Sequence, residues 1–140
     1  VLQAGGIVAR LSNVYGQGMS NKNIISDVLK QITTKGIDSI KIINGTPIRD
    51  MIHVSDVTSC LLAMTTIPKK GVYSVATGID VSMKDLVMTI LEAAQLGGCN
   101  LVESNHSKTT SCISLDISKT KEEFEWSPSI RLKDGLKELI

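Results

Sequence analysis

The chain has 140 residues, of which 42% are hydrophobic and 21% are charged, and its mean hydropathy is +0.14. This length and apolar content suit one domain with a buried core. Fifteen basic residues against fourteen acidic ones leave a net charge of +1, and only 3% of the residues are aromatic. Such a balance provides neither the charge field that attracts nucleic acid or an anionic membrane nor a surface on which bases could stack, so we expect neither partner.

The sequence also indicates the surroundings of the protein. We find no apolar run near the roughly 20 residues that a transmembrane helix needs, and no signal peptide at the start. The three cysteines, Cys60, Cys99 and Cys112, show no CxxC spacing. We expect them to be reduced, buried, small hydrophobic residues of a cytoplasmic protein. The chain begins at Val1 and runs almost directly into a strand-like segment, so we expect it to be part of something longer.

The first third of the chain alternates strand and helix patterns. Residues 7–14 are rich in β-branched and aliphatic side chains and predict one strand that ends at a glycine turn. A helix follows, with Ser20 or Asn21 as its cap and Gly36 at its end. A short strand is expected over residues 40–43. The apolar stripe of the helix consists of Ile24, Ile25, Val28, Leu29 and Ile32.

Residues 49–56 (RDMIHVSD) predict a strand that enters a helix. The two-residue period of a strand places Arg49, Met51 and His53 on one face. The planar guanidinium of Arg49 could hold a phosphate or form a structural ion pair, and the local sequence favours the ion pair. We interpret His53 as a hydrogen-bonded core residue rather than a base. Asp56 is predicted to be the N-cap of the helix, a role worth about 1 kcal/mol, rather than a catalytic carboxylate.

The second half of the chain continues the alternation. Ser82 and Asp85 form a weak capping box at the start of the clearest helix, whose buried stripe includes Leu86 and Ile90. Alternating strands and helices predict an α/β fold with at least part of a parallel sheet. The other expected elements are a helix that Pro68 ends, strands at 72–76 and 99–103, a loop at 105–111, an extended segment at 113–115, and helices from Asp116 or Ser118 to Glu125 and at 132–140.

No complete catalytic or metal-binding set is visible in the sequence. It contains no GxGxxG, P-loop or HExxH motif, and His53 and His106 do not combine with the cysteines in a metal-ligand spacing. Asn13 stands at the end of a presumed parallel strand, where ligands bind in open α/β sheets. An asparagine there could equally bond its own turn, and the local sequence leaves both readings open.

Six segments, in order, carry a family resemblance. They resemble the R-x-x-N-V-Y-G, R-D-x-I-H-V-x-D, V-Y-N-V-G-x-G, D-x-S-K, G-W-x-P and L-x-x-G-L motifs of extended short-chain dehydrogenases/reductases. These are the NAD(P)-dependent nucleotide-sugar epimerases and dehydratases. The matching segments are residues 10–16, 49–56, 72–78, 116–119, 125–128 and 132–136.

The resemblance covers only the C-terminal half of that family. It implies that residues 1–140 hold the last parallel strands of a Rossmann-type sheet plus most of the small substrate-binding α/β domain. The family's glycine-rich cofactor loop and its Tyr-x-x-x-Lys motif lie upstream, and neither Tyr15 nor Tyr73 is followed by lysine four residues on. We therefore assign no catalytic residue, and we expect the chain alone to be catalytically incomplete. NAD or NADP is implied for the intact enzyme.

By position, the resemblance implies two groups of binding residues and no metal ligand. One group would lie near the nicotinamide of the cofactor, and the other would hold a nucleotide-diphosphate sugar, with Asn13 on a phosphate and Arg49 on the pyrophosphate. Fixed donors of this kind are what a diphosphate requires. The first group is Leu11 and Ser12, and the second is Asn13, Asn23, Ile24, Ile42 and Arg49.

The sequence also departs from the family pattern. Asn44 replaces the aspartate of a Gly-Asp-Gly that often precedes the arginine motif, His106 stands where an arginine is common, and Glu125 precedes Trp126. An alternative is a non-catalytic binding or interaction module that kept the fold. Possible partners are the missing N-terminal half and further copies of the chain. Because its strands would have open edges, we expect the isolated chain to self-associate, which sedimentation would test.

Overall fold

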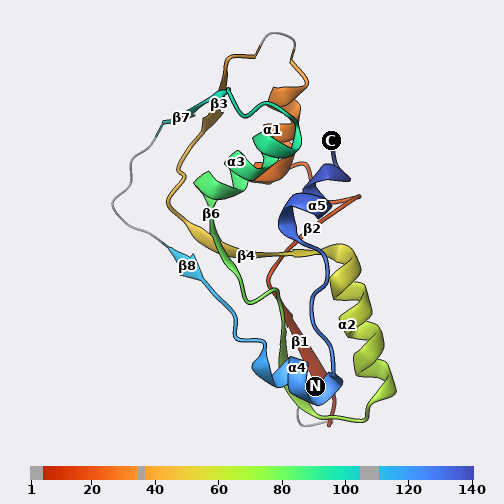
Figure 1. Cartoon of the computed structure of the whole chain (residues 1–140). Coiled ribbons are helices and arrows are strands. Elements are labelled where there is room, and N and C mark those ends of the chain that lie inside the picture. The colour runs from red at the N-terminus through yellow and green to blue at the C-terminus, as the bar shows by residue number, and fades with distance from the viewer. Residues whose placement is uncertain (1–4, 35–36, 105–110) are drawn as a thin grey trace.

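The structure, a computed structural model, describes residues 5–34, 37–104 and 111–140. Strand β4 crosses the middle of the molecule, with α1, α3 and α5 on one side of it and β1 and α4 on the other, while α2 extends from the end of β4 (Figure 1). The elements are β1 (Ile7–Leu11), β2 (Asn13–Tyr15), α1 (Ile24–Ile32), β3 (Ser39–Ile42), β4 (Ile48–His53), α2 (Val54–Thr66), β5 (Gly71–Val75), β6 (Asp80–Ser82), α3 (Met83–Ala93), β7 (Asn100–Glu103), β8 (Cys112–Ile113), α4 (Ser118–Phe124) and α5 (Leu132–Lys137).

Most strand pairs are parallel, which confirms the predicted α/β architecture. β1 pairs with β5 and β3 pairs with β7, both in parallel. β4 is parallel to β2 at its C-terminal end, while its start is antiparallel to β6 and parallel to β8. β4 therefore has three strand partners, β2, β6 and β8. This central position explains why residues 50–53 are buried.

The single strand predicted over residues 7–14 is wrong, because the structure divides it at Ser12. β1 pairs with β5, whereas β2 pairs with β4. The backbone N–H of Ser12 donates to the carbonyl of Val75 at 3.1 Å, and its hydroxyl donates to Asp50 Oδ1 at 3.1 Å. Ser12 therefore lies at the point where the chain leaves one parallel pair and enters another.

Two apolar clusters hold the fold together. One lies among α1, α3, α5 and β3, and the other lies between the β1–β5 pair and helices α2 and α4. Met51 belongs to the first cluster and its neighbour Ile52 to the second, as the alternation of a strand requires. The larger side chains of the second cluster are Ile52, Met64, Tyr73, Phe124 and Trp126.

The predicted caps are only partly correct. Ser82 caps α3, because its hydroxyl accepts from the N–H of Asp85 at 3.0 Å and donates to that carboxylate at 2.6 Å. The cap of α1 is Asn23, whose side-chain oxygen accepts from the N–H of Ser26 at 2.9 Å. The prediction of Ser20 or Asn21 was therefore wrong, and Gly36 lies outside the described residues.

The three cysteines differ in their burial. Cys60 is fully buried, but Cys99 is only partly buried and Cys112 is exposed, so the expectation of three buried cysteines is wrong. Cys112 belongs to the two-residue strand β8, which pairs with the start of β4 (Figure 1). Within the part of the chain that the structure describes, no helix is long and apolar enough to cross a membrane.

Candidate functional site

A cleft of about 520 Å³ brings together all five residues predicted to bind the substrate. It opens among the start of α1, the end of β3 and the start of β4. Its volume falls in the range of small-molecule sites. The described residues that line it are Asn13, Asn21, Lys22, Asn23, Ile24, Asp27, Ile42, Ile43, Asn44, Pro47, Arg49 and Met83.

Each predicted residue reaches the cleft because it stands at the end of an element. Asn13 begins β2, and Ile42 ends β3. Asn23 caps α1 and Ile24 is its first residue. Arg49 is the second residue of β4. Rigid elements therefore position residues that lie up to 36 positions apart in the sequence, between Asn13 and Arg49.

The guanidinium of Arg49 is held by oxygens of the chain itself. Nη1 donates to the carbonyls of Ile48 at 2.7 Å and Ser111 at 2.9 Å, and Nη2 donates to Ser111 Oγ at 2.8 Å. No described carboxylate lies within ion-pair distance of it. The structural ion pair considered for Arg49 is therefore not formed within the described residues. Its positive charge stays available at the wall of the cleft, with the planar group already oriented.

The cleft combines charged, amide and apolar side chains. Two cations, Lys22 and Arg49, and one carboxylate, Asp27, carry its charges. Four asparagines and five apolar residues supply the rest of the described lining, and the apolar ones are Ile24, Ile42, Ile43, Pro47 and Met83. None of the described lining residues is a serine, cysteine, histidine or tyrosine, so Lys22 and Asp27 are the described lining residues that could exchange a proton.

The two residues predicted to lie near a cofactor are outside this cleft. Leu11 ends β1 and is 44% exposed, and Ser12 follows it. Both stand at the carboxyl edge of the parallel β1–β5 pair, where cofactors bind in open α/β sheets. The hydroxyl of Ser12 donates a hydrogen bond to Asp50, so the Ser12 side chain helps to shape this edge.

Asp50 organises this edge, a role that was not predicted although Asp50 belongs to the motif at residues 49–56. Its buried carboxylate accepts the N–H of Thr77 at 2.9 and 3.1 Å, the N–H of Gly78 at 2.6 Å and the hydroxyl of Ser12 at 3.1 Å. These bonds join the ends of β1 and β5 to β4. Because Arg49 precedes Asp50, the same strand contacts both the carboxyl edge and the cleft.

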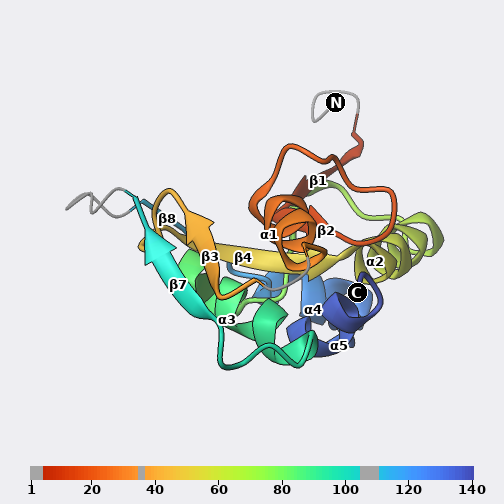
Figure 2. The same cartoon turned by 90° about the horizontal axis from the view of Figure 1, so that it is seen from above.

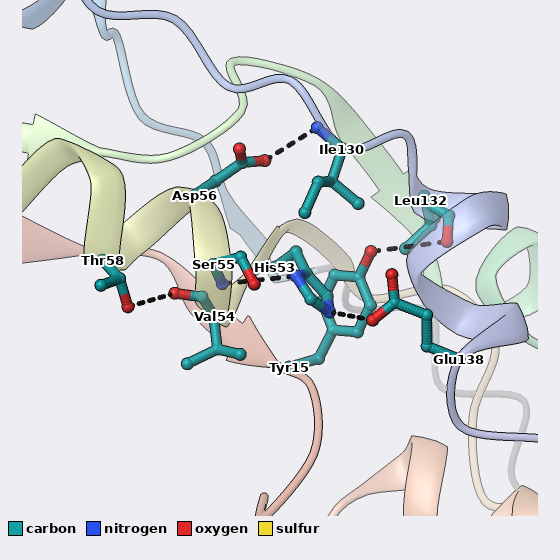
Figure 3. Close-up of polar contacts among 9 residues, drawn as sticks. All are labelled: Tyr15, His53, Val54, Ser55, Asp56, Thr58, Ile130, Leu132 and Glu138. Atoms are coloured by element: carbon teal, nitrogen blue, oxygen red, sulfur yellow. Dashed lines mark hydrogen bonds and ion pairs between the residues drawn. The ribbon is translucent and has the colours of Figure 1, made fainter.

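His53 is a core residue, as predicted, and it does not line the cleft. Its Nδ1 accepts from the N–H of Ser55 at 3.3 Å, so His53 is the N-cap of α2. Its buried Nε2 lies 3.5 Å from Glu138 Oε2, longer than an ordinary hydrogen bond, and its ring meets Tyr15 edge to face (Figure 3). The surroundings of His53 are those of a packing residue between β4 and α5.

Asp56 is not the N-cap of α2, and that prediction was wrong. It lies in the first turn of the helix and is 2% exposed. Its carboxylate turns away from the helix end and accepts the N–H and hydroxyl of Ser129 at 3.0 and 2.9 Å and the N–H of Ile130 at 3.0 Å (Figure 3 shows the Ile130 bond). Asp56 therefore fixes the segment that leads into α5.

Tyr15 is a buried tyrosine whose protonated form is favoured. Burial, together with the carboxylate of Asp56, raises the pKa of Tyr15 to about 12. Its hydroxyl lies 3.4 Å from the carbonyl of Leu132, to which it donates (Figure 3). Gly135 lets α5 approach this ring, because a Cβ at that position would lie 2.5 Å from the Tyr15 hydroxyl.

The described residues hold no metal-binding group. Nowhere in ranges 5–34, 37–104 and 111–140 do three histidine, cysteine, aspartate or glutamate side chains gather as metal ligands. His106, which replaces a common arginine of the family pattern, lies outside the described residues.

Curated proteins similar to this chain act on sugar nucleotides, by their names. CDP-abequose synthase of Salmonella typhimurium is 27% identical over 94% of this chain and 46% of its own length. A putative UDP-glucose 4-epimerase of Methanocaldococcus jannaschii is 29% identical, with shares of 95% and 44%. An Escherichia coli dTDP-4-dehydro-6-deoxyglucose reductase is 28% identical, with shares of 99% and 45%. The chain spans less than half the length of these relatives.

Solved structures share the fold. RMD from Pseudomonas aeruginosa, complexed with NADPH, superposes with a TM-score of 0.82 at 21% identity, over 95% of this chain and 46% of that one. A UDP-glucose 4-epimerase from Thermotoga maritima with UDP-glucose gives a TM-score of 0.79 at 22% identity, with shares of 94% and 43%.

The sequence profile of the NAD dependent epimerase/dehydratase family matches residues 3–76. That range is more than half of the chain, and it contains β1 to β5, including the strands and helix end that form the cleft. The chain therefore belongs to the NAD-dependent epimerase/dehydratase family.

Proposed function

We propose that this chain is the nucleotide-sugar-binding, C-terminal part of an NAD(P)-dependent sugar-nucleotide epimerase or dehydratase. In this proposal the cleft between α1, β3 and β4 holds the nucleoside diphosphate of the substrate. The observation that carries it is the convergence of Asn13, Asn23, Ile24, Ile42 and Arg49 on one cleft.

The chemistry of the cleft supports a diphosphate ligand. Arg49 offers a planar donor group whose orientation is fixed by Ile48 and Ser111. Such a group can bond two phosphate oxygens at once. Asn13 adds an amide donor from β2, and Lys22 adds a second positive charge. Ile24 and Ile42 supply the apolar surface that a base requires, so one cleft offers partners for both ends of a nucleotide.

Leu11 and Ser12 are proposed to lie beside the nicotinamide of the cofactor. The support is their place at the carboxyl edge of β1, next to the end of β5. The backbone turn at Thr77 and Gly78, held by Asp50, closes the same edge. A bound nicotinamide would supply hydride transfer, and the role proposed for these residues is to shape its pocket.

Residues 1–140 are proposed to form one structural unit with an upstream Rossmann half. Among the described residues β1 pairs only with β5, so its other edge has no strand partner. Leu11 and Val14, at the end of β1 and in β2, are 44% and 40% exposed. An upstream parallel strand placed on this edge would continue the sheet and cover these side chains.

Replacing Asn13 with alanine tests the proposed cleft. We expect affinity for a nucleoside diphosphate sugar to fall by about tenfold, since a hydrogen bond to a charged group contributes roughly 1.5–3 kcal/mol. Isothermal titration calorimetry of the full-length protein measures it. Asn100→Ala, an exposed amide on β7 outside the cleft, is the matched control and should bind like the wild type. Equal loss in both variants, or in neither, would contradict the proposal.

The alternative function, a non-catalytic binding module, is decided by the sequence upstream in the same reading frame. A glycine-rich strand–turn–helix and a Tyr-x-x-x-Lys motif there would support the enzyme. A start codon immediately before Val1 would support the module.

A further inference from the structure

We propose that Asp27 makes the cleft selective for a base that carries an amino group, such as cytosine, over the 4-oxo pyrimidines uracil and thymine. This inference rests on the proposed function. Asp27 is the only acidic side chain among the described residues of the cleft, in which Arg49 and Lys22 carry the positive charges. A carboxylate repels a diphosphate, so its presence in this cleft calls for another role.

The position of Asp27 sets the direction of the nucleotide. Asp27 follows Ile24 by one turn of α1, the helix that lies beside β3 (Figure 2). Arg49 approaches from β4 instead. Phosphate oxygens are attracted to Arg49 and to Lys22, which precedes the cap of α1, and they are repelled by Asp27, one turn further along the helix. The diphosphate therefore lies toward β4, and the base lies toward α1 and β3, between Ile24 and Ile42.

The side chain of Gln31 holds the Asp27 carboxylate in place. The Gln31 amide bonds both backbone groups of Lys41 on β3: its Oε1 accepts from the N–H and its Nε2 donates to the carbonyl, each at 2.9 Å. The same Nε2 donates to Asp27 Oδ2 at 3.0 Å. A side chain tied at two points of a strand is a rigid support. It fixes one oxygen of Asp27, and no described group donates to the other, Oδ1.

The backbone at the end of β3 offers further groups that could form hydrogen bonds with the base. Ile42 accepts from the N–H of Ser104, the residue after β7, so its carbonyl faces β7. Lys41 bonds Gln31 of α1 at the opposite edge, and Ile43 follows β3 at a bend. Ile43 lines the cleft, and none of the described residues bonds its N–H or carbonyl. The base end of the cleft thus offers backbone groups next to a fixed acceptor.

A fixed acceptor discriminates between bases by their exocyclic groups. Asp27 Oδ1 can accept from the N4 amine of cytosine, a pairing that carboxylates make with this base. Uracil and thymine present an oxygen at the same position, which cannot donate to Asp27. Because Asp27 is exposed to water, the expected discrimination is the hydrogen bond that is gained with cytosine. Exchanging aspartate for asparagine should reverse the preference, because Gln31 would bind the asparagine oxygen and leave its NH₂ facing the base.

Calorimetric titration of the full-length protein with CDP and UDP tests the inference. The two ligands have the same ribose and diphosphate. We expect the wild type to bind CDP about tenfold more tightly than UDP, within the range of a specific base contact. Asp27→Asn should bind UDP at least as tightly as CDP, and Asp27→Ala should bind both equally. Asp38→Asn, an exposed aspartate outside the cleft, is the matched control.

The outcomes separate this inference from the function on which it rests. Equal binding of CDP and UDP by the wild type, or an unchanged ratio in Asp27→Asn, would overturn the role of Asp27. If Arg49→Ala nevertheless bound CDP and UDP more weakly than the wild type, the proposed diphosphate site would still be supported. Failure of the wild type to bind either nucleotide would overturn both.

Discussion

Replacing Asp56 with alanine is expected to lower the free energy of unfolding by about 3–5 kcal/mol. The buried carboxylate accepts three hydrogen bonds from Ser129 and Ile130, and its loss would leave two backbone N–H groups without that partner. Each hydrogen bond to a charged group contributes roughly 1.5–3 kcal/mol, and the effects are not additive. Urea unfolding followed by circular dichroism measures the change.

Two further variants make this prediction specific. Asp56→Asn keeps one acceptor oxygen and should lose about half as much stability. Glu122→Ala removes an exposed carboxylate of α4 and should change stability by no more than about 0.5 kcal/mol. If Asp56→Ala unfolded like Glu122→Ala, Asp56 would not anchor the segment before α5.

Replacing Arg49 with alanine is expected to weaken binding of a nucleoside diphosphate sugar by about ten- to a hundredfold, because a bidentate, charge-assisted contact is lost. The affinity for the free nucleoside should change little, since that ligand carries no diphosphate. Titration calorimetry with both ligands distinguishes a lost phosphate contact from a distorted cleft.

Arg49→Lys keeps the charge without the planar fork, and its affinity should lie between those of the wild type and the alanine variant. Arg10→Ala serves as the control, because Arg10 is exposed on β1 and contacts Ser74 rather than the cleft. Equal affinity of Arg49→Ala and the wild type would remove Arg49 from the proposed site.

Much of the candidate site could be predicted from the sequence, because the family resemblance implied its residues by position. Asn13 and Arg49 belong to motifs whose order along the chain already indicated the family. Their common cleft could not be derived from local patterns, since it depends on β4 pairing with β2 in one register. Lys22 and Asp27 were missed because an exposed charge near a helix start is ordinary in sequence.

Two of the incorrect predictions share a cause, which is that local rules do not account for partners far along the chain. Asp56 satisfies the rule for an N-cap, but the chain brings Ser129 and Ile130 to it, and the His53 ring takes the cap instead. Residues 7–14 form one apolar run, yet their partners change from β5 to β4 at Ser12. Asp50 belongs to the R-D-x-I-H-V-x-D motif, but its role could not be derived, because its partners at Thr77 and Gly78 come from another strand end.

The most direct test of the account is a crystal structure of the full-length protein with a nucleoside diphosphate sugar. The account predicts the diphosphate within hydrogen-bond distance of Arg49 and Asn13, and the base between Ile24 and Ile42. A diphosphate bound elsewhere on the protein, with the cleft between α1, β3 and β4 empty, would contradict it.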